Sequence, residues 1–412
     1  MPTKTTLAII LSLILVAFAG AGWFFLTQKS NNGETSTNDG FFPFGIFEKQ
    51  PTSGGGDTTG TGDSSQTTNN QNQNEQKKVK LSKISDTPVA GFIVFEKGSS
   101  TIVRYVEKGN GHIQEVNTAS LEKKRVSNTT IPQIHEAIFS DKGEQVLLRY
   151  QKEDSDSIQT FSGKISPKAT STDEGILVGS FLDEDIEQIA VSPDKLKIFT
   201  LSNYGGLSVG TISLFDGTKK SQIFQSSFTE WLPQWVTTDL ISLNTKPSSF
   251  VFGFDYSITT KNSSLTKILG GKYGLTTLTS PDGSRVLFSE NTEYGSPLSV
   301  LIKKTKASYS FGLATLSEKC VWYSNNIDVY CAVPESTPRT ADGYPDSWYQ
   351  GLINFSDTIW KIDTESGATD QLINLREISR EQIDATLMQI NQNGDTLVFL
   401  NKTDNSLWLL SL

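Results

Sequence analysis

A short pattern recurs along the C-terminal four-fifths of the chain: an apolar run, a turn of the Ser-Pro-Asp-Gly kind, and a second apolar run. Its clearest copy is Leu278–Phe288, with the turn at Ser280–Gly283. Related copies lie at Ile138–Leu148, Ala190–Phe199 and Gln389–Phe399. Two apolar runs separated by such a turn are typical of a β-hairpin. The chain is therefore predicted to be a repeat protein made of hairpins.

The spacing of the copies predicts the size of the repeating unit. Steps of 52, 44, 44, 43 and 68 residues separate the equivalent positions Ser140, Ser192, Val236, Ser280, Tyr323 and Asn391. A period of about 40 to 45 residues is typical of a four-stranded propeller blade. We therefore expect an all-β fold, a seven-bladed β-propeller over residues 77–412, with six or eight blades as the alternatives.

The last blade, which begins at Ala385, has only three predicted strands before the chain ends. Residues Lys78–Ile84 alternate apolar and basic side chains and could supply a fourth strand. Pairing this segment as the outer strand of the last blade would close the ring and remove its open sheet edges. We therefore expect the two ends of residues 77–412 to meet in one sheet.

The turn Ser280–Gly283 and, less perfectly, the turn Ser192–Lys195 resemble the signature of TolB-like propeller repeats, over roughly residues 79–412. In such a turn Asp caps the backbone and Gly supplies a positive φ, so both are structural residues. The Gly-His and Trp-Asp signatures of WD-repeat propellers do not recur. The resemblance implies a WD40-like binding platform and supplies no catalytic residues.

The segment before the propeller is predicted to contain a membrane anchor. Leu7–Leu26 is an almost uninterrupted apolar run, long enough to cross the lipid bilayer as a helix. Residues 1–29 are therefore predicted to be a cytoplasmic end and a transmembrane helix. The alternative is a signal peptide that is cleaved after Ala17–Ala19. Both alternatives export the rest of the chain, so we expect a single-pass membrane protein with its propeller on the extracytoplasmic side of a prokaryotic envelope.

Residues 30–76 are rich in Asn, Gly, Thr, Ser and Gln and are predicted to form a disordered polar linker. Within it, Phe41–Phe47 contains five large apolar side chains. We expect this segment to lie on the membrane interface or on the propeller, or to dock a partner.

Cys320 and Cys331 are the only two cysteines and flank the turn Ser324–Ile327. If Tyr323 opposes Asp328 across this hairpin, Cys320 opposes Cys331 at a separation that a disulfide can bridge. We therefore expect a structural disulfide, which agrees with export. The alternative is a pair of reduced, buried thiols.

The sixth predicted blade carries a long insertion, Pro334–Phe355, which is rich in aromatic residues. Long loops between strands often carry recognition, and large amphipathic side chains are common interface anchors. Tyr344, Trp348 and Tyr349 are therefore the candidate partner-binding residues. The alternative is that they fold back over the edge or the channel mouth of the propeller.

Composition and spacing argue against several classes of function. The formal net charge of −9 argues against nucleic-acid binding, and His112 and His135 are the only histidines, which leaves too few ligands for a Cys/His zinc cluster. The acidic residues around Asp183 lack the spacing of a calcium loop. Ser208 lies in a Gly-x-Ser-x-Gly sequence, but no histidine follows it in the chain to act as its base.

No catalytic, cofactor-binding or metal-binding residue is therefore predicted, and the chain is expected not to be an enzyme. Its expected function is that of a membrane-anchored scaffold that binds an envelope protein or a surface glycan. The alternative is a propeller-type carbohydrate-active or lyase enzyme, because carboxylates that meet at the central channel leave no trace in sequence spacing. Clustered acidic side chains at the channel would favour the enzyme, and an aromatic patch on the insertion would favour the scaffold.

Overall fold

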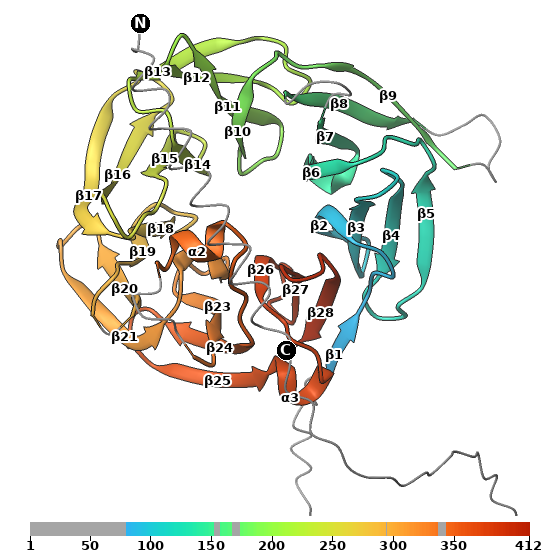
Figure 1. The fold of residues 1–412 in the computed structure, drawn as a ribbon. Helices are drawn as coiled ribbons and strands as arrows, with labels where there is room; N and C mark the ends of the chain where they lie inside the picture. Colours follow the sequence, from blue (N-terminus) through green and yellow to red (C-terminus); the bar gives the residue numbers. More distant parts are fainter. Residues whose placement is uncertain (1–79, 152–156, 167–173, 294, 337–342) are drawn as a thin grey trace, which may run out of the picture. The chain divides into compact units, whose positions relative to one another are not determined.

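The computed structural model describes residues 80–151, 157–166, 174–293, 295–336 and 343–412. These residues form seven four-stranded antiparallel sheets, which stand around a central axis (Figure 1). The predicted seven-bladed β-propeller is thus confirmed. The predicted anchor Leu7–Leu26, the linker 30–76 and the segment Phe41–Phe47 lie outside the described residues. Within the described residues, no helix is long and apolar enough to cross a membrane.

Each blade is made of four strands that follow one another from the axis to the rim, and the first four blades do so in chain order. Blade one contains β2 (Val89–Lys97), β3 (Ser100–Glu107), β4 (Ile113–Asn117) and β5 (Lys123–Ser127). Blade two contains β6 (Ile134–Phe139), β7 (Gln145–Gln151), β8 (Ile158–Ser166) and β9 (Ile176–Phe181). Blade three contains β10 (Ile186–Val191), β11 (Lys197–Tyr204), β12 (Leu207–Leu214) and β13 (Ser221–Ser226). Blade four contains β14 (Trp231–Thr237), β15 (Leu240–Thr245), β16 (Phe252–Thr259) and β17 (Leu265–Tyr273).

The other three blades include the insertion and the closure of the ring. Blade five contains β18 (Thr276–Thr279), β19 (Arg285–Ser289), β20 (Pro297–Ile302) and β21 (Ser308–Ala314). Blade six contains β22 (Cys320–Trp322), β23 (Asp328–Pro334), β24 (Asp357–Asp363) and β25 (Thr369–Asn374). Blade seven contains β26 (Ala385–Ile390), β27 (Thr396–Asn401), β28 (Leu407–Ser411) and β1 (Lys80–Lys83). Short helices lie at η1 (Asp141–Gly143), η2 (Ser317–Lys319), α2 (Asp346–Tyr349) and α3 (Leu375–Ser379).

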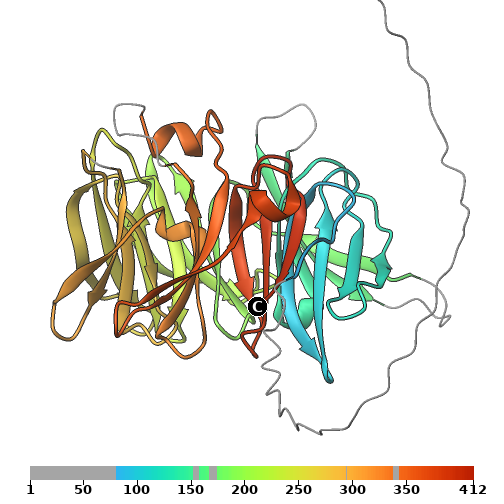
Figure 2. The same cartoon turned by 90° about the horizontal axis from the view of Figure 1, so that it is seen from below.

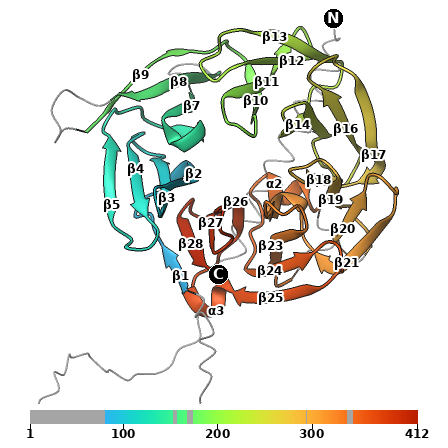
Figure 3. The same cartoon turned by 180° about the vertical axis from the view of Figure 1, so that it is seen from behind.

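Blade seven joins the two ends of the propeller, as the sequence predicts. Strand β1 pairs antiparallel with β28, with Leu81 opposite Leu410, and Figure 3 shows the two strands together at the rim. Ile84 follows β1 and is buried against Leu407 and Leu409 of blade seven and Val89 of blade one. The ring is therefore closed by hydrogen bonds within blade seven and by apolar packing between blades seven and one.

The hydrophobic core lies between neighbouring blades. Leu287 and Val300 of blade five, for example, pack with Val329 and Ile362 of blade six. Cys320 opposes Cys331 in the hairpin β22–β23 and is bonded to it, which confirms the predicted disulfide. Each blade thus presents apolar side chains on both of its faces, as a sheet packed between two others requires.

Candidate functional site

The two faces of the propeller are defined by the direction of the innermost strands. We call the face where these strands begin the upper face, and the face where they turn into the second strands the lower face. The insertion of blade six, with α2, stands on the upper face, at the top of Figure 2. The turn Ser280–Gly283 lies on the lower face, where Ser280 Oγ accepts a hydrogen bond from Arg285 N at 3.0 Å. The Ser-Pro-Asp-Gly turns are therefore structural, as predicted.

A cavity of ≈ 330 Å³, the upper cavity, lies at the upper end of the central channel. Uncharged polar side chains from blades three, four and five line this cavity, and the carboxyl group of Glu318 lines it as well. The polar lining residues are Gln188, Gln234, Ser242, Asn244, Thr277 and Glu318. Leu387 lies in this lining and also in that of a second cavity nearer the lower face, so both cavities belong to one channel.

Glu318 is the titratable group of the upper cavity. It belongs to η2, directly before the innermost strand of blade six, and its carboxylate accepts a hydrogen bond from the hydroxyl of Tyr349. Burial raises the pKa of Glu318 to about 7. A carboxyl group that titrates near neutrality can both take up and release a proton, which is the property that general acid–base catalysis requires.

A buried charge network holds the insertion over this carboxyl group. Lys319 Nζ lies 2.8 Å from Asp357 Oδ2 and also donates to Asp384, and all three side chains are fully buried. The second oxygen of Asp384 accepts hydrogen bonds from Trp348 Nε1 at 2.9 Å and from the main-chain nitrogen of Phe355 at 3.1 Å. Since Lys319 follows Glu318 and Trp348 precedes Tyr349, the network fixes both partners of the Glu318–Tyr349 hydrogen bond.

A second acidic group lies behind the wall of the upper cavity. Asp255 of β16 is fully buried and accepts a hydrogen bond from Ser242 Oγ at 2.7 Å. Burial raises the pKa of Asp255 to about 6. In the part of the chain that the structure describes, Asp255 Oδ2 and Asn244 Oδ1 have no hydrogen-bond partner. Both oxygens are buried, and Asp255 itself does not line the upper cavity.

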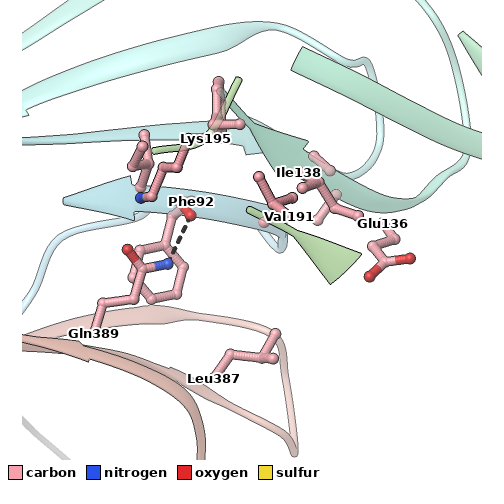
Figure 4. Close-up of a pocket in the computed structure, with 12 residues that line it drawn as sticks. Phe92, Glu136, Ile138, Val191, Lys195, Leu387 and Gln389 are labelled. Atoms are coloured by element: carbon pink, nitrogen blue, oxygen red, sulfur yellow. Dashed lines mark hydrogen bonds between the residues drawn. The ribbon is translucent and has the colours of Figure 1, made fainter. Parts of the chain in front are cut away.

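The second cavity, of ≈ 250 Å³, is the lower cavity and lies among β2, β6, β10 and β26 (Figure 4). Its side chains are mostly apolar, with Glu136, Lys195 and Gln389 as the polar members. Gln389 donates to Phe92 O and accepts from Val94 N, so it ties blade seven to blade one. The carboxylate of Glu136 lies 2.6 Å from Arg149 Nη1.

The insertion residues that the sequence singled out are placed against the propeller. Tyr344 is 1% exposed and Trp348 is 5% exposed, and both pack with Leu316 and Phe355. Tyr349 is half-buried at Glu318. Of the two alternatives for this insertion, the burial of Tyr344 and Trp348 favours the one in which it folds back over the propeller, because buried rings are not available as surface anchors.

The other residues weighed from the sequence are not brought together into a site. His112 Nε2 lies 3.3 Å from Thr130 Oγ1, and Ser208 is buried in β12. In the described parts of the chain, no three His, Cys, Asp or Glu side chains gather in one place.

Sequence reasoning missed Glu318 and Asp255, which gain their properties from burial. The sequence signal for Asp255 was its place as the single charged residue in the strand segment Phe252–Thr259. Glu318 carried no such signal, because the partner that covers it lies in an insertion.

The fold and the channel define the molecule as a seven-bladed β-propeller whose upper cavity contains a titratable carboxyl group, that of Glu318. No family model matches the sequence, and no curated protein matches it. Among solved structures, the chain is similar to oligogalacturonate lyase from Vibrio parahaemolyticus, with a TM-score of 0.53 and 10% identity over 82% of this chain and 94% of that one.

Two further structures are less similar. An oligogalacturonate lyase in complex with manganese gives a TM-score of 0.48 and 9% identity over 81% of this chain and 97% of that one. A puromycin-hydrolyzing peptidase from Mycobacterium tuberculosis gives a TM-score of 0.46 and 10% identity over 76% of this chain and 52% of that one.

The first similarity overturns the argument on which the expectation of a non-enzyme rested. The sequence argument rested on the lack of a recognisable catalytic motif, yet a propeller matched over 94% of its own length is a lyase. At 10% identity the likeness shows the fold alone, and the catalytic residues of such a propeller are not expected to appear as a motif in this sequence.

Proposed function

We propose that this protein is a carbohydrate-active enzyme of the lyase type, with Glu318 as the acid–base group at the upper end of the channel. The observation that carries the proposal is the place of the Glu318 carboxyl group in a cavity lined by amides and hydroxyls, where burial raises its pKa to about 7. The similarity of fold to oligogalacturonate lyase supports the choice of reaction class.

A lyase of this kind breaks a C–O bond without water as nucleophile. The base takes a proton from the carbon next to a sugar carboxylate, the C–H electron pair becomes a C=C bond, and the C–O bond to the next sugar breaks. The departing oxygen then takes a proton from water. Near pH 7 a large fraction of Glu318 is ionised and able to accept the first proton, while Tyr349 orients its carboxylate.

The cavity wall suits a sugar because its polar groups match hydroxyls. Gln188 and Ser242 line the upper cavity from different blades, together with Asn244. Such groups donate to and accept from sugar hydroxyls. The surface glycan expected as a binding partner becomes the substrate under this proposal.

The proposal includes an extracytoplasmic site of action, with the chain anchored in the lipid bilayer through Leu7–Leu26. The Cys320–Cys331 disulfide supports this placement, since disulfides persist in oxidising compartments.

The test is the incubation of the full-length protein in detergent with oligogalacturonides, followed by the ultraviolet absorbance of the unsaturated product. We expect the wild-type protein to form this product. Glu318→Gln should lower the rate about 100-fold or more, because the amide cannot accept the proton. Glu365→Gln changes an exposed carboxylate at the lower face and should keep the wild-type rate.

Two results would contradict the proposal: no product from the wild-type protein across acidic and neutral oligosaccharides, or an unchanged rate in Glu318→Gln. If new reducing ends formed without the unsaturated product, the reaction at this site would be hydrolysis and not elimination.

A further inference from the structure

The lower cavity contains a lysine where related turns have glycine. The turns that follow the innermost strands of blades two, five and seven have a glycine with positive φ at the equivalent position: Gly143 at 66°, Gly283 at 73° and Gly394 at 73°. In blade three this position is Lys195, with φ 55°. Blade six also has a side chain at this position, Asn326 with φ 59°, so what distinguishes Lys195 is the cavity that its side chain enters.

The Lys195 side chain extends into the lower cavity, toward Phe92 and Gln389 (Figure 4). Among the described residues, none forms a hydrogen bond or an ion pair with its ammonium group, and only Asp141 attracts it from a distance. Burial lowers the pKa of Lys195, because the charged form loses its hydration without gaining a partner.

The neighbouring charged and polar groups are already paired. Glu136 points away from Lys195 in Figure 4 and binds Arg149, whose other terminal nitrogen donates to Ile186 O at 2.7 Å. Asp194 accepts hydrogen bonds from Ser192 Oγ and Leu196 N. Among the described residues, the ammonium group of Lys195 is therefore left without a directly paired carboxylate, and Asp141 attracts it only from a distance.

The walls around this charge are apolar. Phe92, Ile138, Val191 and Leu387 line the cavity, which has a volume of ≈ 250 Å³. An ammonium group on such a wall matches a ligand with one carboxylate and a compact apolar body. The carboxylate would pair with the ammonium, and the body would displace water from the walls.

We propose that the lower end of the channel is a binding site for a small organic monocarboxylate, with Lys195 as its counter-ion. This site lies at the opposite end of the channel from Glu318 and does not depend on the enzymatic proposal.

The test uses the full-length protein in detergent and two probes of equal shape, cyclohexanecarboxylate and the neutral cyclohexanecarboxamide, in calorimetric titrations. We expect the wild-type protein to bind the carboxylate at least about tenfold more tightly than the amide. Lys195→Met should abolish this preference. Lys197→Met removes an exposed ammonium two residues away and should keep it.

A second variant distinguishes a loss of the binding preference from misfolding of Lys195→Met. Lys195→Gly introduces the residue that the turn has in blades two, five and seven, so we expect it to fold and to lose the preference as well. Equal binding of the two probes by the wild-type protein, no binding of either, or a preference that survives in both Lys195 variants would overturn the proposal.

Discussion

Among the described residues of the propeller, three buried carboxyl groups have raised pKa values. Burial raises the pKa of Glu318 to about 7 and those of Asp255 and Asp357 to about 6, the last of these against the attraction of Lys319. Glu318 lines the channel, whereas Asp357 is enclosed by its partners. Only the first is therefore placed to exchange a proton with a ligand.

The pKa of Asp255 predicts how stability depends on pH. Because this pKa is about 6 in the folded protein and 3.8 ordinarily, Asp255 stabilises the fold fully below pH 4 and loses this contribution as the pH rises through 6. The loss amounts to roughly 3 kcal/mol. In Asp255→Asn the side chain does not ionise. The difference in Tm between variant and wild type should therefore become more positive from pH 4 to pH 8, as thermal unfolding can measure.

Asp239, a half-exposed carboxylate of the same blade that pairs with Lys261, provides the control for that series. Asp239→Asn should follow the wild-type dependence on pH between 4 and 8. If the Tm of Asp255→Asn and that of the wild-type protein changed in parallel with pH, Asp255 would not titrate in this range.

Sequence alone does not reveal these properties, because they depend on residues far apart in the chain. Asp255 is one polar residue in a strand until Ser242 and Thr277 are seen to enclose it. Lys195 was visible in the sequence as a departure from the Ser-Pro-Asp-Gly turn, but its unpaired charge became apparent only with the neighbouring blades in place.

At the scale of elements, the hairpin β22–β23 and the insertion after it differ in how far the sequence determines them. The pairing of Cys320 with Cys331 follows from a tight local turn, and its register was predicted correctly. The insertion is held by Lys319 and Asp384, which are 65 residues apart. No local pattern could reveal that contact, and for this reason the burial of Trp348 was only one of two alternatives.

The same network predicts the effect of removing one charge. In Asp384→Asn one of the two negative charges that balance the buried ammonium group of Lys319 is removed. The hydrogen bonds from Trp348 and Phe355 to residue 384 are weakened as well. Breaking a buried charge network in this way destabilises a protein by about 3 to 5 kcal/mol. We expect a corresponding loss in denaturant unfolding and faster hydrogen exchange at residues 343–355.

Asp370→Asn, at an exposed position of β25, should change neither measurement. Unaltered exchange at residues 343–355 in Asp384→Asn would mean that the apolar contacts of Tyr344 and Trp348 hold the insertion without the charge network.

At the scale of the whole molecule, most of the architecture could be predicted from the sequence because the blades of a propeller are repeats. The period of the turns predicted four strands per blade, and the shortage of one strand after Ala385 pointed to Lys78–Ile84 as its source. The lining of the channel could not be predicted from the sequence, because each of its two cavities is lined by residues from at least four blades.

Closure predicts a large effect of removing the first strand. Deleting residues 77–85 removes β1 and Ile84, exposing the edge of β28 and part of the core between blades seven and one. We expect the Tm to fall by many degrees in thermal unfolding. Deleting the nine residues 61–69 is the length-matched control and should leave the Tm unchanged, and equal transitions in the two deletions would refute the role of β1.

The pairing of β1 with β28 also orders events during biosynthesis. Of the described strands, β1 is translated first and β28 last, and Lys83 and Trp408, which face each other, are 325 positions apart. At about 5 to 20 residues per second, roughly 16 to 65 s pass between the translation of these two residues. During that time β1 has no partner, and its lysines at positions 80 and 83 discourage pairing with another chain. The ring therefore closes only after β28 has left the ribosome, and a product that stops before residue 407 cannot close at all.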